Sequence, residues 1–122
     1  VGCGRISFNH IKAILNHHKE ASLTAICDVD KEKINDAINL INQENLKNNL
    51  ECRPKIFNSY INLLKSVKDK QIELDLIVLA TPSGLHSEQT ILGSNLGINI
   101  CTEKPMATNL EDAQAAGYQF AI

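Results

Sequence analysis

With 122 residues and a hydrophobic content of 43%, the chain has the size of one domain, large enough to bury roughly two-thirds of the surface exposed on unfolding. Its formal net charge is −2 and its charges are mixed along the sequence, which argues against a nucleic-acid partner. No apolar run approaches the roughly 18 residues of a membrane span, and no charged-then-apolar leader opens the chain, so we expect no membrane contact and a cytoplasmic location.

The first half of the chain alternates helix and strand patterns. Apolar residues recur at helical spacing in two segments, at Ile11, Ile14 and Leu15 and at Ile34, Ala37, Ile38 and Ile41. The β-prone run 23–27 lies between them, and Asp30 is well placed as the N-cap of the second helix. The polar, asparagine-rich residues 42–49 show no apolar period and predict a surface loop before a short strand near 55–57.

The second half continues this alternation. Ser59 is placed to cap a helix, and residues 69–70 mark a turn after it. That helix carries Tyr60, Leu63, Leu64 and Val67 on one side. Residues 74–80 are apolar at almost every position, which indicates a parallel strand covered on both faces.

The last third of the chain predicts two helices and a strand. Residues 85–96 follow as a helix that Gly97 ends in the left-handed conformation, before a strand over 98–102. Thr108 and Glu111 have capping-box spacing, so a final helix is expected there, running through Ala113 and Ala116.

Strands separated by helices indicate right-handed crossovers and a parallel sheet. The expected fold is therefore a Rossmann-type, doubly wound α/β domain over residues 1–122, with helices on both faces and ligands beyond the carboxyl ends of the strands. Only Val1 precedes the first glycine, so we expect the domain to be incomplete at both ends and to lack most of its first strand.

The opening residues carry a dinucleotide-binding pattern. Gly2, Gly4 and Ser7 have the G-x-G-x-x-small spacing that allows a tight turn and a close approach to pyrophosphate, although such a glycine pair also occurs in an ordinary turn. The helix that follows would direct its amides and dipole toward an anion. Asp28 ends the next strand at roughly the spacing, about 20 residues, of the acid that binds ribose hydroxyls. A carboxylate there, with no arginine after it, favours NAD over NADP.

Two loops at strand ends carry further candidate residues. Thr81, Pro82 and His86 either form the wall of a cofactor site or belong to an ordinary β-to-α turn, where His86 would be a hydrogen-bonding residue at the helix start. Glu103-Lys104-Pro105 also ends a strand, and Pro105 allows a cis bond that fixes where Lys104 points. Lys104 would then hydrogen-bond a substrate hydroxyl and assist its deprotonation. A solvated surface lysine is the equal alternative.

The four cysteines have neither metal-site nor disulfide-scaffold spacing. Their positions are Cys3, Cys27, Cys52 and Cys101. We interpret them as small buried hydrophobic residues and predict no metal site.

Four stretches in order, VGCGRIS with the following His10, AICDVD, LATPSGLH and TEKPMAT, closely resemble the N-terminal domain of the glucose-fructose oxidoreductase, inositol dehydrogenase and MocA family (Gfo/Idh/MocA). The resemblance spans essentially the whole chain. Within the family, GRIS, TPSGLH and TEKPMAT are most similar to nucleotide-sugar 3-dehydrogenases that act on UDP-N-acetylglucosaminuronate.

The resemblance implies a role for each motif. Gly2, Gly4, Arg5 and Ile6 would lie along the pyrophosphate, Asp28 would hold the adenine ribose, Thr81, Pro82 and His86 would approach the cofactor, and Glu103 and Lys104 would sit at the nicotinamide. Family members transfer hydride from a sugar or cyclitol hydroxyl to the nicotinamide, and Lys104 matches the lysine that positions and acidifies that hydroxyl.

The resemblance also implies parts that lie outside the sequence. In the family, a C-terminal α+β domain supplies a histidine base, shapes substrate selection and makes oligomer contacts. We therefore expect an NAD-dependent sugar or nucleotide-sugar dehydrogenase, acting at C3 and homo-oligomeric when complete, with this chain inactive alone. The alternatives are a non-catalytic dinucleotide-binding sensor or repressor of the same fold, and a Rossmann-type domain for S-adenosylmethionine, which would have no need of Lys104.

Overall fold

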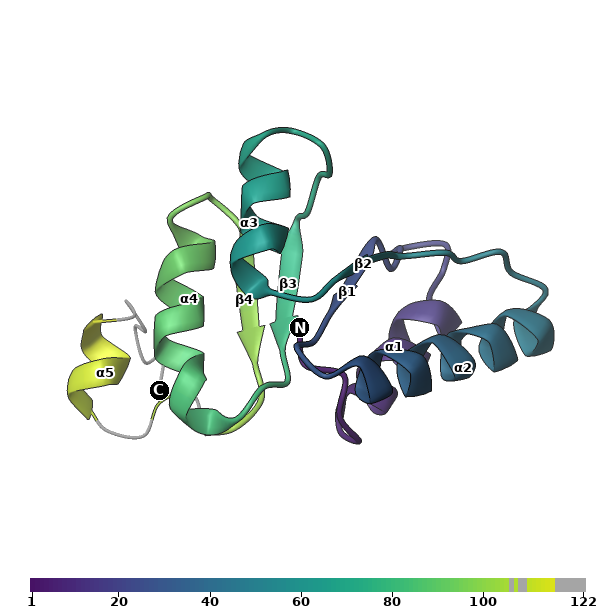
Figure 1. Cartoon of the computed structure of the whole chain (residues 1–122), viewed down its shortest axis with the longest axis horizontal. Coiled ribbons are helices and arrows are strands. Elements are labelled where there is room, and N and C mark those ends of the chain that lie inside the picture. The colour runs from purple at the N-terminus through teal and green to yellow at the C-terminus, as the bar shows by residue number, and fades with distance from the viewer. Residues whose placement is uncertain (106, 108–109, 116–122) are drawn as a thin grey trace.

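Helices and strands alternate along the chain in the computed structural model, which describes residues 1–105, 107 and 110–115 (Figure 1). In order, the elements are α1 (Ser7–Asn16), β1 (Ala25–Cys27), α2 (Lys31–Asn48), β2 (Lys55–Phe57), α3 (Tyr60–Lys68), β3 (Leu76–Leu79), a 3-10 turn (Ser83–Leu85), α4 (His86–Ser94), β4 (Asn99–Thr102) and α5 (Leu110–Ala115). The predicted alternation of strand and helix is confirmed.

The strands form two parallel pairs joined by the first two residues of the chain. β1 pairs with β2, and β3 pairs with β4. Between the pairs, the Val1 ammonium donates to the Val78 carbonyl (2.8 Å) and the Val1 carbonyl accepts from Ala80 N–H (2.8 Å). Gly2 N–H donates to the Cys27 carbonyl on the other side (2.7 Å). The order across the sheet is therefore β2, β1, residues 1–2, β3 and β4.

Beside Val1 the two strand pairs leave a groove. It has a volume of about 420 Å³ and is lined by the facing segments 20–25 and 73–78, with Val1, Ile14 and Leu63 also contributing. Two backbone edges, one from the β1 segment and one from the β3 segment, therefore face each other across this groove.

Two apolar cores lie on opposite faces of the sheet. One holds Cys3, Ile11, Leu15, Ile26, Ile34, Ala37 and Ile41, and the other holds Cys27, Tyr60, Leu63, Leu64, Ile72, Ile77, Leu79 and Ile98. Strand β1 contributes Ile26 to the α1/α2 side and Cys27 to the α3 side, as the alternation of a strand requires. The ribbon shows α1 and α2 beside β1 and β2, and α3 and α4 beside β3 and β4 (Figure 1). Helices thus cover both faces, which confirms the Rossmann-type α/β fold.

The loop predicted over residues 42–49 is wrong, because helix α2 runs through Asn48. Glu44 is buried in this part of the helix, and the Asn45 side chain pairs with the backbone of Cys52, donating to its carbonyl (2.9 Å) and accepting from its N–H (3.1 Å). Asn49 then ends the helix in the left-handed conformation with φ 54°. Asn45 therefore holds the segment around Cys52 against the helix. The asparagines before residue 49 do not interrupt the helix.

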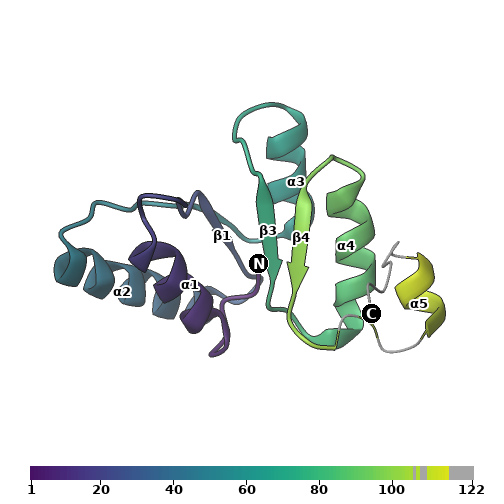
Figure 2. The ribbon, with the colours of Figure 1, turned by 180° about the vertical axis from the view of Figure 1, so that it is seen from behind.

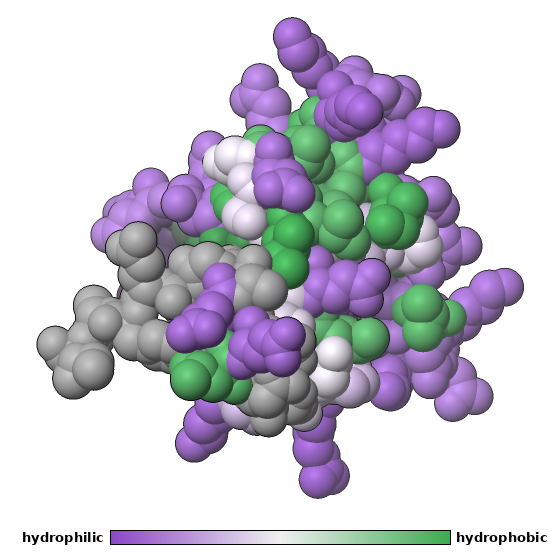
Figure 3. All heavy atoms as spheres, turned by 90° about the vertical axis from the view of Figure 1, so that its left-hand side faces the viewer, coloured by the Kyte–Doolittle hydropathy of each residue, from purple (hydrophilic) through white to green (hydrophobic). Residues whose placement is uncertain are grey.

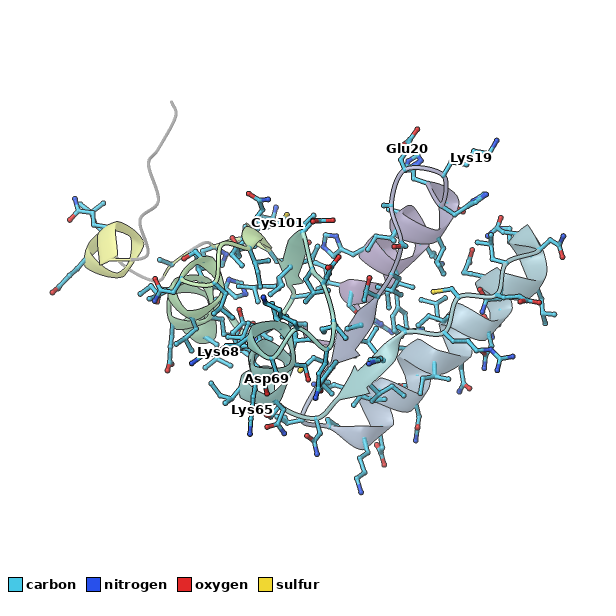
Figure 4. All side chains as sticks on the ribbon, turned by 90° about the horizontal axis from the view of Figure 1, so that it is seen from above. Lys19, Glu20, Lys65, Lys68, Asp69 and Cys101 are labelled. Carbon is cyan, nitrogen blue, oxygen red and sulfur yellow. The ribbon has the colours of Figure 1, made fainter. Side chains whose placement is uncertain are left out.

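Strand β3 is not covered on both faces, contrary to the prediction from its continuous apolar run. Ile77 and Leu79 are buried, whereas Leu76 is 53% exposed. Seen from behind, the β3–β4 pair lies in front of α3 (Figure 2). Cys101 of β4 is also exposed, and from above it lies on the side of the sheet opposite Lys65 and Lys68 of α3 and the following Asp69 (Figure 4). Its side chain is therefore not the buried hydrophobic residue that we expected.

The predicted caps are confirmed where the structure describes them. Asp30 accepts from Glu32 N–H (2.9 Å) at the start of α2, and the Ser59 hydroxyl accepts from Asn62 N–H (3.0 Å) at the start of α3. Gly97 has φ 78° after α4. The predicted capping residue Thr108 lies outside the described residues.

Other boundaries move by one or two residues. The first strand begins at Ala25, and residues 83–85 form a 3-10 turn, so that α4 itself starts at His86. Viewed from the α4 and α5 side, hydrophobic residues lie between hydrophilic ones on the surface (Figure 3). Among the residues with described structure, no helix has the length and apolar character to cross a membrane.

Candidate functional site

The glycine turn is shaped by its contact with the end of β3. Gly2 has φ 87°, in the left-handed region that favours glycine. A Cβ on Gly2 would lie 2.6 Å from both the carbonyl carbon and the carbonyl oxygen of Ala80, and 2.8 Å from the nitrogen of Thr81. Glycine is therefore required here both by its conformation and by the close approach of a neighbouring strand end.

Gly4 is in a different environment, because a Cβ there would meet no atom within 4 Å. Ser7 is buried where a third glycine is common, and its hydroxyl donates to the Gly4 carbonyl (2.6 Å). Helix α1 begins at this residue, and no described side chain caps its N-terminus. Arg5 and Ile6 are both exposed beside it. The Ser7 and Phe8 N–H groups donate to the Gly4 and Arg5 carbonyls (3.0 and 3.3 Å). The turn thus presents open space and the positive end of a helix dipole.

Asp28 ties the end of β1 to the glycine turn. Its Oδ2 accepts from Cys3 N–H (2.8 Å) and its Oδ1 accepts from Asp30 N–H (2.8 Å). Asp30, and not Asp28, caps helix α2. A carboxylate has about four lone-pair positions, so half-buried Asp28 keeps acceptor capacity for a ligand hydroxyl.

Of the three candidate residues after β3, one is exposed and two are anchored by hydrogen bonds. The Thr81 hydroxyl donates to Gln89 Oε1 (2.5 Å), and Pro82 is exposed. His86 is 1% exposed, with Nε2 2.7 Å from the Thr81 carbonyl oxygen and Nδ1 2.8 Å from the Pro105 carbonyl oxygen. His86 is thus a hydrogen-bonding residue at the helix start, and its contact with a cofactor stays a prediction.

The loop after β4 holds the candidate lysine. Glu103 N–H donates to the Leu79 carbonyl (2.9 Å), and a Glu103 carboxylate oxygen lies 2.5 Å from His10 Nε2. The Lys104–Pro105 peptide bond is cis, as the sequence allowed. Lys104 is exposed, and its ammonium makes no hydrogen bond or ion pair with another residue that the structure describes, so it is available to a ligand.

These segments meet at one edge of the sheet. Asp28, Thr81 and Glu103 follow β1, β3 and β4, and parallel strands bring their carboxyl ends to the same edge. Direct contacts connect the turn to Asp28 through Cys3, and α1 to Glu103 through His10. The contact partners of His10 and His86 were not predicted, because no local pattern announces a contact across 93 residues or to a backbone carbonyl.

The thiols of Cys3 and Cys27 near this edge have low reactivity. Burial raises the pKa of Cys3, and burial raises the pKa of Cys27 to about 11, so both remain protonated near neutral pH. The Cys3 thiol donates to the Cys27 carbonyl (3.6 Å). Within the described part of the chain, no group of three His, Cys, Asp or Glu side chains is arranged to hold a metal ion.

Comparisons with solved structures identify similar proteins. The WlbA dehydrogenase from Bordetella pertussis, solved with NADH and UDP-GlcNAcA, is 38% identical with a TM-score of 0.76, over 95% of this chain and 31% of its own. WlbA from Chromobacterium violaceum, with the same two ligands, is 34% identical with a TM-score of 0.77, over 95% and 29%. Myo-inositol dehydrogenase from Lactobacillus casei, with NAD(H) and myo-inositol, is 25% identical with a TM-score of 0.73, over 95% and 30%.

The chain thus spans less than a third of the length of these structures. No curated protein matches it. Residues 1–119 match the model of the Gfo/Idh/MocA oxidoreductase family, described as having an NAD-binding Rossmann fold. Together with the glycine turn, Asp28 and the three strand-end loops, this match shows that the chain belongs to the Gfo/Idh/MocA family of oxidoreductases and forms its NAD-binding Rossmann fold.

Proposed function

We propose that the complete protein is an NAD-dependent dehydrogenase that oxidises a hydroxyl group of a sugar or nucleotide sugar, and that residues 1–122 supply its cofactor-binding half. The observation that carries this proposal is the convergence of three motifs on one sheet edge. The glycine turn contacts Asp28 through Cys3, and the helix that it opens contacts Glu103, next to Lys104. The candidate dinucleotide-binding turn and the candidate catalytic lysine therefore lie at the same sheet edge, which supports the proposal.

The residues at this edge fit a dinucleotide. The open space over Gly4 and the uncapped start of α1 suit a pyrophosphate, because backbone amides and a helix dipole stabilise an anion there. The spare acceptor positions of Asp28 suit ribose hydroxyls and would repel a 2′-phosphate, which favours NAD over NADP. Arg5, Ile6, Thr81, Pro82 and His86 flank the same edge as further candidate contacts.

Oxidation of a hydroxyl group to a carbonyl removes a hydride from the carbon and a proton from the oxygen. Bound NAD supplies the hydride acceptor. Lys104 would donate a hydrogen bond to the substrate hydroxyl, which favours the alkoxide that develops as the hydride leaves. The similarity to WlbA and the resemblance to nucleotide-sugar 3-dehydrogenases favour UDP-GlcNAcA as the substrate and its C3 hydroxyl as the reacting group. We also propose a homo-oligomer for the complete protein.

The test compares Lys104→Ala with Lys68→Ala in the complete protein. Lys68 lies in the last turn of α3, away from the strand-end loops, and serves as the matched control for loss of one exposed lysine. We expect Lys104→Ala to abolish oxidation of UDP-GlcNAcA by NAD while NADH binding, measured by calorimetry, changes little. Lys68→Ala should keep both. Undiminished turnover in Lys104→Ala would contradict the assignment of the lysine.

A second arm tests the cofactor with Asp28→Ala. Because Asp28 also holds Cys3 and Asp30, its removal is expected to weaken NADH binding by about tenfold or more and to reduce the preference for NADH over NADPH. If the unmodified, folded protein bound neither nucleotide, the basis of the proposal would be removed. If it bound NADH and oxidised no sugar, a sensor or repressor would be favoured. If Asp28→Ala bound NADH as tightly as the unmodified protein, the role of Asp28 would be contradicted.

A further inference from the structure

The backbone of the Lys104 loop is anchored on each side by a histidine from a different helix. On one side, Glu103 pairs with His10 of α1 at 2.5 Å. On the other side, the Pro105 carbonyl lies 2.8 Å from Nδ1 of His86, the first residue of α4. Neither histidine has a role in the hydride or proton transfer proposed above, and together they contact the two chain neighbours of its candidate lysine.

Lys104 depends on these anchors for its position. Its side chain is exposed, and its ammonium makes no hydrogen bond or ion pair with any residue that the structure describes. The four side-chain torsions are therefore unconstrained, and the region that the ammonium can reach is set by the backbone that carries it. That backbone is fixed by its two neighbours, through the His10–Glu103 pair and the Glu103 N–H bond to Leu79 before it, and through the His86–Pro105 contact after it.

His86 is the more rigid of the two anchors. It is 1% exposed, whereas the His10 and Glu103 side chains are 31% and 24% exposed. Its helix packs tightly on the sheet, because Gly93 of α4 leaves no room for a Cβ against Tyr60 and Ile100. A hydrogen bond from such a residue fixes a loop better than a bond between two exposed side chains, which lose more freedom in forming it.

The two contacts of His86 compete for its protons. Both partners, the carbonyl oxygens of Thr81 and Pro105, are acceptors only. A neutral imidazole has one N–H and can donate to one of them, whereas both bonds form together only when both nitrogens carry hydrogen. The two bonds therefore have separable roles, since one holds the loop after β3 and the other holds the loop after β4.

We propose that His86 is a positioning residue for Lys104, and that it acts through the bond from its Nδ1 to the Pro105 carbonyl and not through the Nε2 contact with Thr81. The inference rests on the proposed function, because it assigns the purpose of the bond to the lysine of that reaction. It adds to the candidate cofactor contact of His86 a second role, which a side chain that is only 1% exposed can perform through a hydrogen bond beneath the sheet edge.

Two substitutions separate the two bonds. The side-chain amide nitrogen of asparagine can take the place of Nδ1, and that of glutamine can take the place of Nε2, so His86→Asn keeps a donor for Pro105 and His86→Gln keeps a donor for Thr81. Both variants lose the imidazole ring, which makes each the control for the other. The His10–Glu103 pair is untouched in both.

The first measurement needs no substrate. Amide hydrogen exchange is followed at Glu103, whose N–H donates to Leu79, and at Asn99, whose N–H donates to Asp75 at the other end of β4, in the complete protein. We expect exchange at Glu103 to be about tenfold faster in His86→Gln than in His86→Asn, with Asn99 alike in both, because only the glutamine variant loses the Pro105 bond. Equal exchange at Glu103 in the two variants overturns the inference.

The second measurement is turnover with UDP-GlcNAcA and NAD. We expect kcat to be about tenfold or more lower in His86→Gln than in His86→Asn, with similar KM for NAD, because a misplaced lysine affects the reacting geometry. The reverse order of kcat values overturns the inference and assigns the role to Thr81. If exchange follows the expected order and even the unmodified protein oxidises no sugar, the proposed function fails while the Pro105 anchor stands.

Discussion

Substitution by alanine should have different effects at the two glycines of the opening turn, lowering stability at Gly2 and NADH affinity at Gly4. Gly2→Ala puts a side chain at φ 87°, which costs about 1–2 kcal/mol. It also brings a Cβ to 2.6 Å from the backbone of Ala80, which must shift, at about 1–3 kcal/mol. The free energy of unfolding of the domain should therefore fall by about 2–5 kcal/mol.

Gly4→Ala should leave folding intact. A Cβ at this position meets nothing within 4 Å, and the backbone is outside the left-handed region, so the free energy of unfolding should change by less than about 1 kcal/mol. NADH affinity should nevertheless fall by about tenfold or more, because the added methyl occupies the space through which a pyrophosphate would approach the turn.

The assay measures urea denaturation without nucleotide and NADH binding by calorimetry, for both variants in the complete protein. The distinction between the two glycines would be refuted by either of two results. One is a loss of stability in Gly4→Ala as large as that in Gly2→Ala. The other is unchanged NADH affinity in a folded Gly4→Ala protein.

Three further predictions concern packing, pH and thiols. Gly93→Ala places a Cβ 2.7 Å from the Tyr60 hydroxyl, so the free energy of unfolding measured in urea should fall by about 1–3 kcal/mol. Adding Tyr60→Phe, which removes the hydroxyl, should recover part of this loss. If the effects of the two substitutions on the free energy of unfolding simply add, the clash is excluded. Burial raises the pKa of Cys27 to about 11 and that of Tyr60 to about 12. The folded state then keeps protons that the unfolded state releases, so the urea midpoint should fall as pH rises from about 9 to 11, with a shallower fall in Cys27→Ala. At pH 8 a thiol reagent should label Cys101 rapidly and Cys27 only on unfolding, and Cys101→Ser should remove the fast phase.

Local sequence patterns predicted the elements that depend on local chemistry. The caps at Asp30 and Ser59 and the left-handed Gly97 are encoded within a few residues, and the structure confirms them. The end of α2 was misplaced because Asn45 is a poor helix former in isolation, and its bonds to Cys52 form only after the chain turns back. The exposure of Leu76 depends on which segments cover the sheet, and hydropathy does not contain that information.

The candidate site likewise has features that the sequence predicts and contacts that it does not predict. Strand and helix order place Asp28 and the glycine turn together, because parallel strands end at one edge. The partners of His10 and His86 depend on how two loops settle against two helices, and one of those partners is a backbone carbonyl that every residue possesses. The sequence therefore predicts which segments lie together at the site, but it does not predict which atoms of those segments contact each other.

The groove beside Val1 determines how the sheet can be extended. It has a volume of about 420 Å³ and lies between a backbone edge of the β1 segment and one of the β3 segment. Residues joined to the amino side of Val1 are led along both edges. An apolar, strand-forming segment can pair with both edges, whereas a proline-rich segment lacks the N–H groups for that pairing. The sequence of such residues therefore influences how stably the domain folds.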